Sequence, residues 1–220
     1  GQLGYGDNQP RGDTNNEIYN LPAVDLGLKY FYDKWGMLLL DYPKKVSASS
    51  NHTCVLTNLG RVKCWGYNDG GITGIFNNGE PIGDDPDELR NSPFLYNGGA
   101  IGIASGKFHN CALIEGGFLE DNYVECWGRN GNSQLGLGDR PSTSFIGDSD
   151  NEFFSTDKRV DIDTLTYGNI TTLKSNDAVT CVVTEFGYLL CWGKNNKGQL
   201  GRNIDIQIVK KLILNYQIWI

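Results

Sequence analysis

Long apolar runs and helix-forming patterns are missing from this sequence. The longest clean apolar run covers only residues 37–40, whereas a membrane-spanning helix needs about 20 apolar residues. The 220 residues include a single methionine but 29 glycines, nearly twice the usual glycine share of about 7%. So much glycine predicts many turns, and the rest of the composition favours β structure. We therefore predict an all-β protein that does not insert into a membrane.

Positive charge and histidine are also scarce. Lysine and arginine total 19 against 26 aspartates and glutamates, which gives a net charge of −7. A nucleic-acid surface must commit lysines and arginines to phosphates, so we predict no nucleic-acid partner. The only histidines are His52 and His109, and no nucleophile with a matching base stands out. The sequence therefore predicts no catalytic, metal-binding or cofactor-binding residues, and no cofactor.

What the sequence does contain is an internal repeat. Three features recur in one register, and such periodicity indicates an array of similar structural units. The tripeptide Cys-Trp-Gly, followed by an asparagine three residues after the tryptophan, occurs at Trp65, Trp127 and Trp192. A Gly-Gln-Leu-Gly signature occupies residues 1–4 and 198–201, with diverged copies at 71–74 and 133–136. A Gly-Asp-x-x-x-Glu element begins at Gly12, Gly83 and Gly147.

Each repeat also contains a predicted β-hairpin. In the first, Cys54 and Cys64 are equidistant from Leu59, and Gly60 supplies the positive φ that the turn between them needs. Directly opposed residues then share one face of the hairpin. The pairs are Cys54 with Cys64, Leu56 with Val62, Thr53 with Trp65, and Val55 with Lys63.

The other two hairpins follow the same symmetry. In the third, Cys181 faces Cys191, Val183 faces Leu189 and Val182 faces Leu190. Both of its faces are mostly apolar, so we expect burial on both sides, as in sheets stacked face to face. In the middle hairpin, Cys111 and Cys126 are 15 positions apart because extra residues lengthen the tip, while Leu113 still pairs with Val124.

The six cysteines are interpreted as three disulfides within hairpins. The symmetry selects Cys54–Cys64, Cys111–Cys126 and Cys181–Cys191 from the 15 pairings that six cysteines allow, and directly opposed strand residues are within disulfide reach. Reduced structural cysteines and a metal site remain alternatives. His52 and His109 each precede a cysteine by two positions, but a tetrahedral zinc site needs four ligands and each hairpin offers at most three. Disulfides place the chain outside the cell, at its surface or in the periplasm.

Two stretches carry a family resemblance. Residues 51–56 with 60–68, and the Gly-Gln-Leu-Gly at 198–201, resemble the regulator of chromosome condensation repeat, and the cysteines resemble its extracellular microbial branch. The match extends over residues 1–203, with Val179 in place of the histidine in the third repeat. The family includes a nuclear exchange factor for a small GTPase and β-lactamase inhibitor protein II.

The resemblance implies a partial β-propeller: three four-stranded blades of a ring that usually has seven. We expect repeats at about 1–74, 75–136 and 137–203, and a non-repeat tail at 204–220. Three repeats cannot close such a ring, and we expect the first repeat to have no preceding blade within these 220 residues to cover it. Open ends would expose strands. We therefore expect a fragment of a longer protein, with neighbouring blades of the same chain as partners.

Three functions are compatible with these observations. The disulfides, the acidic balance and the missing catalytic set favour a secreted or cell-surface scaffold, with loops that bind an unknown protein partner and no enzymatic activity. A guanine-nucleotide exchange factor is the alternative that the resemblance implies, although it requires a reducing compartment. A glycan-active enzyme is the second alternative, and it would need a convergent acid–base pair.

Several residues also have competing local interpretations. We predict that the three repeat tryptophans are buried and form no ligand platform, and that both histidines are blade-packing residues that hydrogen-bond the backbone. The Gly-Asp loops could bind calcium, but aspartate as a turn cap is the simpler interpretation. The aromatic insertion at residues 28–45 must cover an edge or bind something. The segment around Lys210 and Lys211 is expected to be a frayed tail, with an amphipathic surface segment as the alternative.

Overall fold

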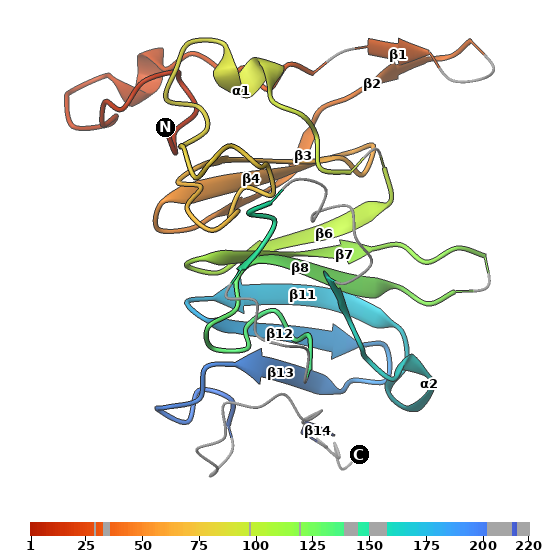
Figure 1. The fold of residues 1–220 in the computed structure, drawn as a ribbon. Coiled ribbons are helices and arrows are strands. Elements are labelled where there is room, and N and C mark those ends of the chain that lie inside the picture. The colour runs from red at the N-terminus through yellow and green to blue at the C-terminus, as the bar shows by residue number, and fades with distance from the viewer. Residues whose placement is uncertain are drawn as a thin grey trace.

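The computed structural model describes residues 1–28, 30–32, 36–96, 98–118, 120–138, 145–149, 158–201 and 213–214. The chain forms three antiparallel sheets that follow one another in sequence and stack face to face (Figure 1). This architecture confirms the all-β prediction. None of the helices in the described part is long and apolar enough to cross a bilayer.

The three sheets share one plan. In each sheet, the first strand pairs with the first strand of the cysteine hairpin. The second strand of the hairpin then pairs with a later segment of the chain. The first sheet has β3 (Pro43–Ala48), β4 (His52–Thr57) and β5 (Val62–Gly66), and Gly66 forms a bridge with Ile82. The second has β6 (Ala100–Ser105), β7 (His109–Ile114) and β8 (Tyr123–Arg129), with β9 (Phe145–Ile146) and β10 (Arg159–Val160) both paired to β8. The third has β11 (Ile170–Asn176), β12 (Val179–Thr184), β13 (Leu189–Gly193) and β14 (Ile213–Leu214).

The remaining elements lie outside these sheets. A two-stranded hairpin of β1 (Tyr30–Tyr32) and β2 (Leu38–Leu40) projects from the first sheet (Figure 1). Single helical turns are η1 (Ile18–Asn20), α1 (Glu88–Asn91) and α2 (Thr164–Tyr167). Because β14 pairs with β13, residues 213–214 belong to the third sheet, so this part of the expected non-repeat tail extends a blade. Lys210 and Lys211 lie outside the described residues.

The hairpin registers agree with the cysteine symmetry. Cys54 pairs with Cys64 in the first hairpin, Cys111 with Cys126 in the second, and Cys181 with Cys191 in the third. The two flanking pairs that the sequence analysis named for the third hairpin, and the Leu113–Val124 pair of the second, are also present. The longer tip of the second hairpin therefore leaves its register unchanged.

Burial is less uniform than the sequence predicts. Every residue of β5 and β7 is buried, but β12 and β13 alternate between buried and more exposed positions. In the third hairpin, Val183 is 36% exposed, and Cys181, Leu189 and Cys191 are half-buried. The expectation that this hairpin is buried on both sides is wrong, because only the face toward the second sheet is covered by the described residues.

The outer face of the first sheet is covered by the chain itself. Val55 and Trp65 on this face form one apolar cluster with Leu26, Ile82 and Leu89. The N-terminal segment and α1 therefore lie over the sheet as a cap (Figure 1). The expectation that this end is open does not hold for this face.

A repeated polar contact joins each sheet to the preceding Gly-Gln-Leu-Gly loop. The indole Nε1 of Trp65 donates to the carbonyl of Gln2 at 2.9 Å, that of Trp127 to Ile72 at 3.1 Å, and that of Trp192 to Gln134 at 3.0 Å. The same three carbonyls accept bonds from the side chains of Thr53, Asn110 and Thr180, respectively. We call this arrangement the loop–tryptophan contact. It ties each of these loops to the sheet that follows it in sequence.

The repeated asparagines brace the loops at residues 68–74, 130–136 and 195–201. The Oδ1 atoms of Asn68, Asn130 and Asn195 accept hydrogen bonds from the backbone N–H groups of Thr73, Leu135 and Leu200, respectively. A side chain that satisfies a backbone donor five residues ahead closes the loop locally. All three loops therefore have the same internal brace, including the last loop, at residues 195–201.

Candidate functional site

The cysteines and tryptophans that the sequence singled out make contacts within and between the sheets. Disulfide bonds join Cys54 to Cys64, Cys111 to Cys126, and Cys181 to Cys191, each across its own hairpin. The three tryptophans are at most 5% exposed, and they are occupied by the loop–tryptophan contact. They therefore form no ligand platform at the surface.

Both histidines connect neighbouring sheets, but their partners are side chains and not the backbone groups that we predicted. His52 Nε2 donates to Asn110 Oδ1 at 2.9 Å, and His109 Nε2 donates to Thr180 Oγ1 at 2.8 Å. Burial lowers the pKa of His52, and it lowers the pKa of His109 to about 3, with a smaller contribution from the charge of His52. Both rings are therefore neutral at physiological pH. The neighbouring cysteines are oxidised, so these His-x-Cys pairs offer no thiolate to a metal.

The Gly-Asp loops use their glutamates as local caps. Glu17 Oε2 accepts from the N–H of Gly12 at 2.7 Å, and Glu88 Oε2 accepts from the N–H of Gly83 at 2.6 Å. The backbone acceptor in the first two loops is therefore the glutamate and not the aspartate that we predicted. In the third loop, Glu152 lies outside the described residues. Among the described residues, no group of three metal-ligating side chains is found.

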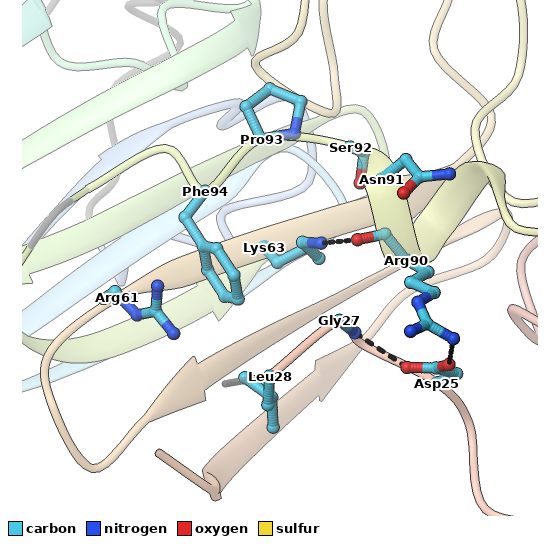
Figure 2. Close-up of a pocket in the computed structure, with 10 residues that line it drawn as sticks. All are labelled: Asp25, Gly27, Leu28, Arg61, Lys63, Arg90, Asn91, Ser92, Pro93 and Phe94. Carbon is cyan, nitrogen blue, oxygen red and sulfur yellow. Dashed lines mark hydrogen bonds and ion pairs between the residues drawn. The ribbon is translucent and has the colours of Figure 1, made fainter. Parts of the chain in front are cut away.

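A pocket that the sequence analysis did not single out lies between the first sheet and its cap (Figure 2). Its volume is about 560 Å³, within the range of small-molecule and side-chain pockets. One wall comes from the N-terminal segment, one from the start of β5, and one from α1 and the residues after it. The lining residues are Asp25, Gly27, Leu28, Arg61, Lys63, Arg90, Asn91, Ser92, Pro93 and Phe94.

Lys63 forms the buried floor of this pocket. It has no exposed surface, and its ammonium donates to the carbonyls of Leu26 at 2.9 Å, Leu89 at 2.8 Å and Arg90 at 3.4 Å. Burial lowers the pKa of Lys63 to about 8; nearby Arg61 adds to this effect, and Asp25 opposes it. Three carbonyls for three N–H donors hold the protonated form in place. Lys63 thereby ties both cap segments to β5.

Arg61 and Phe94 form the wall beside Lys63. The guanidinium carbon of Arg61 lies 3.9 Å from the Phe94 ring centroid, and Lys63 Nζ lies 4.5 Å from the same centroid. Both distances are within the range of cation–π attraction. Arg61 also forms an ion pair with Asp41, whose side chain is buried behind it. Phe94 is therefore held between two cations.

An exposed ion pair lies at the mouth of the pocket. Arg90 Nη1 lies 3.2 Å from Asp25 Oδ2, and both side chains are 59% exposed (Figure 2). The other oxygen of Asp25 accepts from the N–H of Gly27 at 2.9 Å. The lining thus has three cations and one carboxylate, so its field favours a bound anion.

One signal in the sequence could have led to this pocket. The hairpin symmetry placed Lys63 opposite Val55 in a hairpin whose faces are otherwise apolar. A buried lysine requires polar partners, so the position of Lys63 in the hairpin indicates a polar environment around its ammonium group. The partners themselves, at residues 26 and 89–90, are too far along the chain for pairing rules to identify.

Sequence comparisons identify the repeat. The family model described as the regulator of chromosome condensation (RCC1) repeat matches residues 44–72. The chain is 28% identical over 170 residues to the human probable E3 ubiquitin-protein ligase HERC6, covering 76% of this chain and 15% of that protein. It is 29% identical over 180 residues to an RCC1 repeat-containing protein of Dictyostelium discoideum, covering 78% and 32%, respectively. It is 31% identical over 133 residues to the ultraviolet-B receptor UVR8 of Arabidopsis thaliana, covering 53% and 28%. The chain thus spans at most a third of the length of these relatives.

Solved structures with RCC1 folds match the stack of sheets. Human WBSCR16 superposes with a TM-score of 0.55 at 16% identity, covering 81% of this chain and 40% of that one. Prp20p of Saccharomyces cerevisiae, described with its binding to Gsp1p and histones, gives a TM-score of 0.52 at 16% identity, covering 80% and 39%. These similarities concern the fold. They identify the three sheets as blades of a β-propeller whose ring is not closed.

Proposed function

Because this chain consists of repeats of the regulator of chromosome condensation family, we propose that it is a non-enzymatic β-propeller scaffold that binds a partner protein. The observation that carries the proposal is the rigid stack beneath a loop-built cap. Three disulfides and three loop–tryptophan contacts fix the sheets, while the cap presents a pocket with exposed charges at its mouth. Binding residues are often found on loops that a rigid framework positions.

The disulfides support an extracellular or cell-surface location, with the periplasm as a further candidate. Such bonds persist in oxidising compartments and are rare in the cytosol and nucleus. All six cysteines are in disulfides, and none is free. An oxidising location outside the cytosol is therefore part of the proposed function.

Guanine-nucleotide exchange is a second candidate function. The observation in its favour is the similarity to Prp20p, a protein whose structure is described with its binding to Gsp1p. The disulfides disfavour it, because small GTPases work in reducing compartments. A glycan-active enzyme is the weaker alternative, and a screen for glycan cleavage tests it directly.

We also propose a further repeat as a partner within a longer protein. The Gln199 carbonyl occupies the same position in its braced loop as Ile72 and Gln134 occupy in theirs, and Gln199 has the same place in the Gly-Gln-Leu-Gly signature as Gln2. This loop follows β13 of the third sheet, and the third hairpin of that sheet has a more exposed face. A following blade with its own tryptophan would complete this interface.

Two measurements test the proposed function. The chain is produced through an oxidising secretory route, and its thiols are counted without reduction. It is then assayed for release of fluorescent GDP from a panel of small GTPases and for capture of binding partners by chemical crosslinking on intact cells. We expect no free thiols, no accelerated GDP release, and saturable crosslinking to a protein. Free thiols in the native source together with GDP release would overturn the proposal in favour of exchange activity.

A further inference from the structure

We propose that the pocket between the first sheet and its cap binds a carboxylate of the partner protein, with an adjacent apolar group against Phe94 and Leu28. The proposal rests on the scaffold function above, since it names the chemistry by which the partner would be recognised. The carboxylate could come from an acidic side chain or from a chain terminus, and the experiment below separates these sources.

The charge distribution around the pocket is the first argument. The whole chain has a net charge of −7, yet this lining has three cations and one carboxylate. Asp41 neutralises Arg61, and Asp25 neutralises Arg90. Lys63 is bonded to carbonyl groups, and it takes part in none of the ion pairs found in the described part of the chain. The pocket therefore has one positive charge in excess, which a monoanion would balance.

The ion pair at the mouth is the second argument. Asp25 already places a carboxylate oxygen 3.2 Å from the Arg90 guanidinium, so the position accepts this group. Exposed ion pairs contribute little to stability, and both partners here are well exposed. A partner's carboxylate can therefore replace Asp25 on Arg90, while the bond from Gly27 to the other Asp25 oxygen keeps the segment folded.

The shape of the pocket is the third argument. The Phe94 ring is fixed between Arg61 and Lys63, and Leu28 and Pro93 complete an apolar lining. A volume of about 560 Å³ is larger than a carboxylate alone requires. It suits a carboxylate together with a ring or an aliphatic side chain.

The test uses the oxidised full chain and three small peptide probes. One is a tripeptide with blocked termini and a glutamate between two phenylalanines, and the second is its glutamine counterpart. The third is a blocked dipeptide that ends in a free phenylalanine carboxylate. Binding is followed by NMR through the backbone amides of Gly27 and Arg90. We expect the glutamate or the free-carboxylate peptide to shift these amides saturably, and the stronger of the two identifies the source.

Paired variants give effects of opposite sign. Asp25→Asn removes the competing charge but keeps an acceptor for the Gly27 N–H, so we expect affinity to rise about two- to fivefold. Arg90→Gln should lower affinity about tenfold. The controls are Asp177→Asn and Arg159→Gln, at exposed sites away from the pocket. The first changes the net charge as Asp25→Asn does, and the second as Arg90→Gln does. We expect each control to change affinity only by the effect of net charge.

Three results would overturn the carboxylate site. They are equal binding of the glutamine peptide, an Asp25→Asn effect no larger than that of Asp177→Asn, and the absence of saturable shifts with every probe. The scaffold proposal is judged separately by the crosslinked partner. If Arg90→Gln leaves partner capture unchanged while no probe binds, the pocket proposal fails and the scaffold proposal stands.

Discussion

The position before the second cysteine of each hairpin has a different kind of side chain in each of the three sheets. The position before the second cysteine is Lys63 in the first sheet, bonded to carbonyls, and Glu125 in the second, 3.2 Å from Lys158. In the third sheet it is the apolar Leu190. One structural position thus accepts a cation, an anion or an alkyl group, provided that the neighbouring segments supply suitable partners.

His109 should make stability depend on pH. Its pKa is about 3 in the folded chain and near 6.5 when the chain is unfolded. Below pH 6.5 the unfolded state therefore binds a proton that the folded state does not, and stability falls as the pH drops toward 3. The slope is at most about 1.4 kcal/mol per pH unit. Urea unfolding at pH 7, 6, 5 and 4 measures it.

The matched variant for this prediction is His109→Gln, which removes the titrating group and leaves the carboxylates unchanged. We expect a shallower pH dependence than in the parent chain. If the variant does not fold, the His109 ring proton in the parent chain should still show no NMR titration down to pH 4. A titration midpoint near 6.5 in the folded chain would contradict the prediction.

Trp65 should contribute strongly to stability. Trp65→Ala removes a buried ring and should cost about 3–5 kcal/mol of unfolding free energy. Trp65→Phe keeps an aromatic ring but loses the bond to the Gln2 carbonyl, which should cost roughly 1 kcal/mol from the hydrogen bond. Urea titration of both variants checks the order. A negligible loss for the alanine variant would mean that the ring is not part of the core.

At the scale of elements, the hairpins were the most predictable part of the fold. Two cysteines at equal distances from a turn fix the pairing, and the pairing fixes every opposed residue, which is why even the longer tip before Tyr123 did not disturb the prediction. The β14 strand and the cap over Trp65 were not predicted. Their pairing depends on segments far along the chain, and no local periodicity identifies such partners.

The disulfides should stabilise their hairpins by similar amounts. Replacing Cys54 and Cys64 together by alanine should lower the unfolding free energy by roughly 2.5–3 kcal/mol, because the closed loop is short, and removal of Cys111–Cys126 should cost slightly more. Urea unfolding of the two double variants measures this difference. Peptide mapping without reduction is the control, and a Cys54 linked outside its own hairpin would refute the pairing.

At the scale of the whole molecule, the outer faces of the first and third sheets differ in how much of their apolar surface is covered. The cap covers the first sheet, whereas the third presents Val183, and β2 presents Leu38 and Leu40 at 52% and 51% exposure. Apolar surface of this kind favours association. The family resemblance predicted stacked blades, but it could not indicate which end of this chain is covered.

We therefore expect the chain to self-associate when produced alone under oxidising conditions. Val183→Lys and Leu38→Lys should each shift the sedimentation profile toward the monomer, because a charge at either surface opposes apolar contact. Lys174→Gln, at an exposed position of β11, is a control that should have little effect. A sharply melting monomer of 24.3 kDa for the parent chain would contradict the prediction.

The loop–tryptophan contact also has a consequence for inheritance. Each repeat ends in the loop that the next repeat's tryptophan requires, so every junction between repeats uses the same pair of parts. A recombination event that adds or removes one whole repeat therefore restores an intact junction, wherever within the repeat the exchange occurs. An exchange that shifts the phase leaves a tryptophan without its carbonyl. Genes for such arrays can thus change length in whole-repeat steps while each junction remains complete.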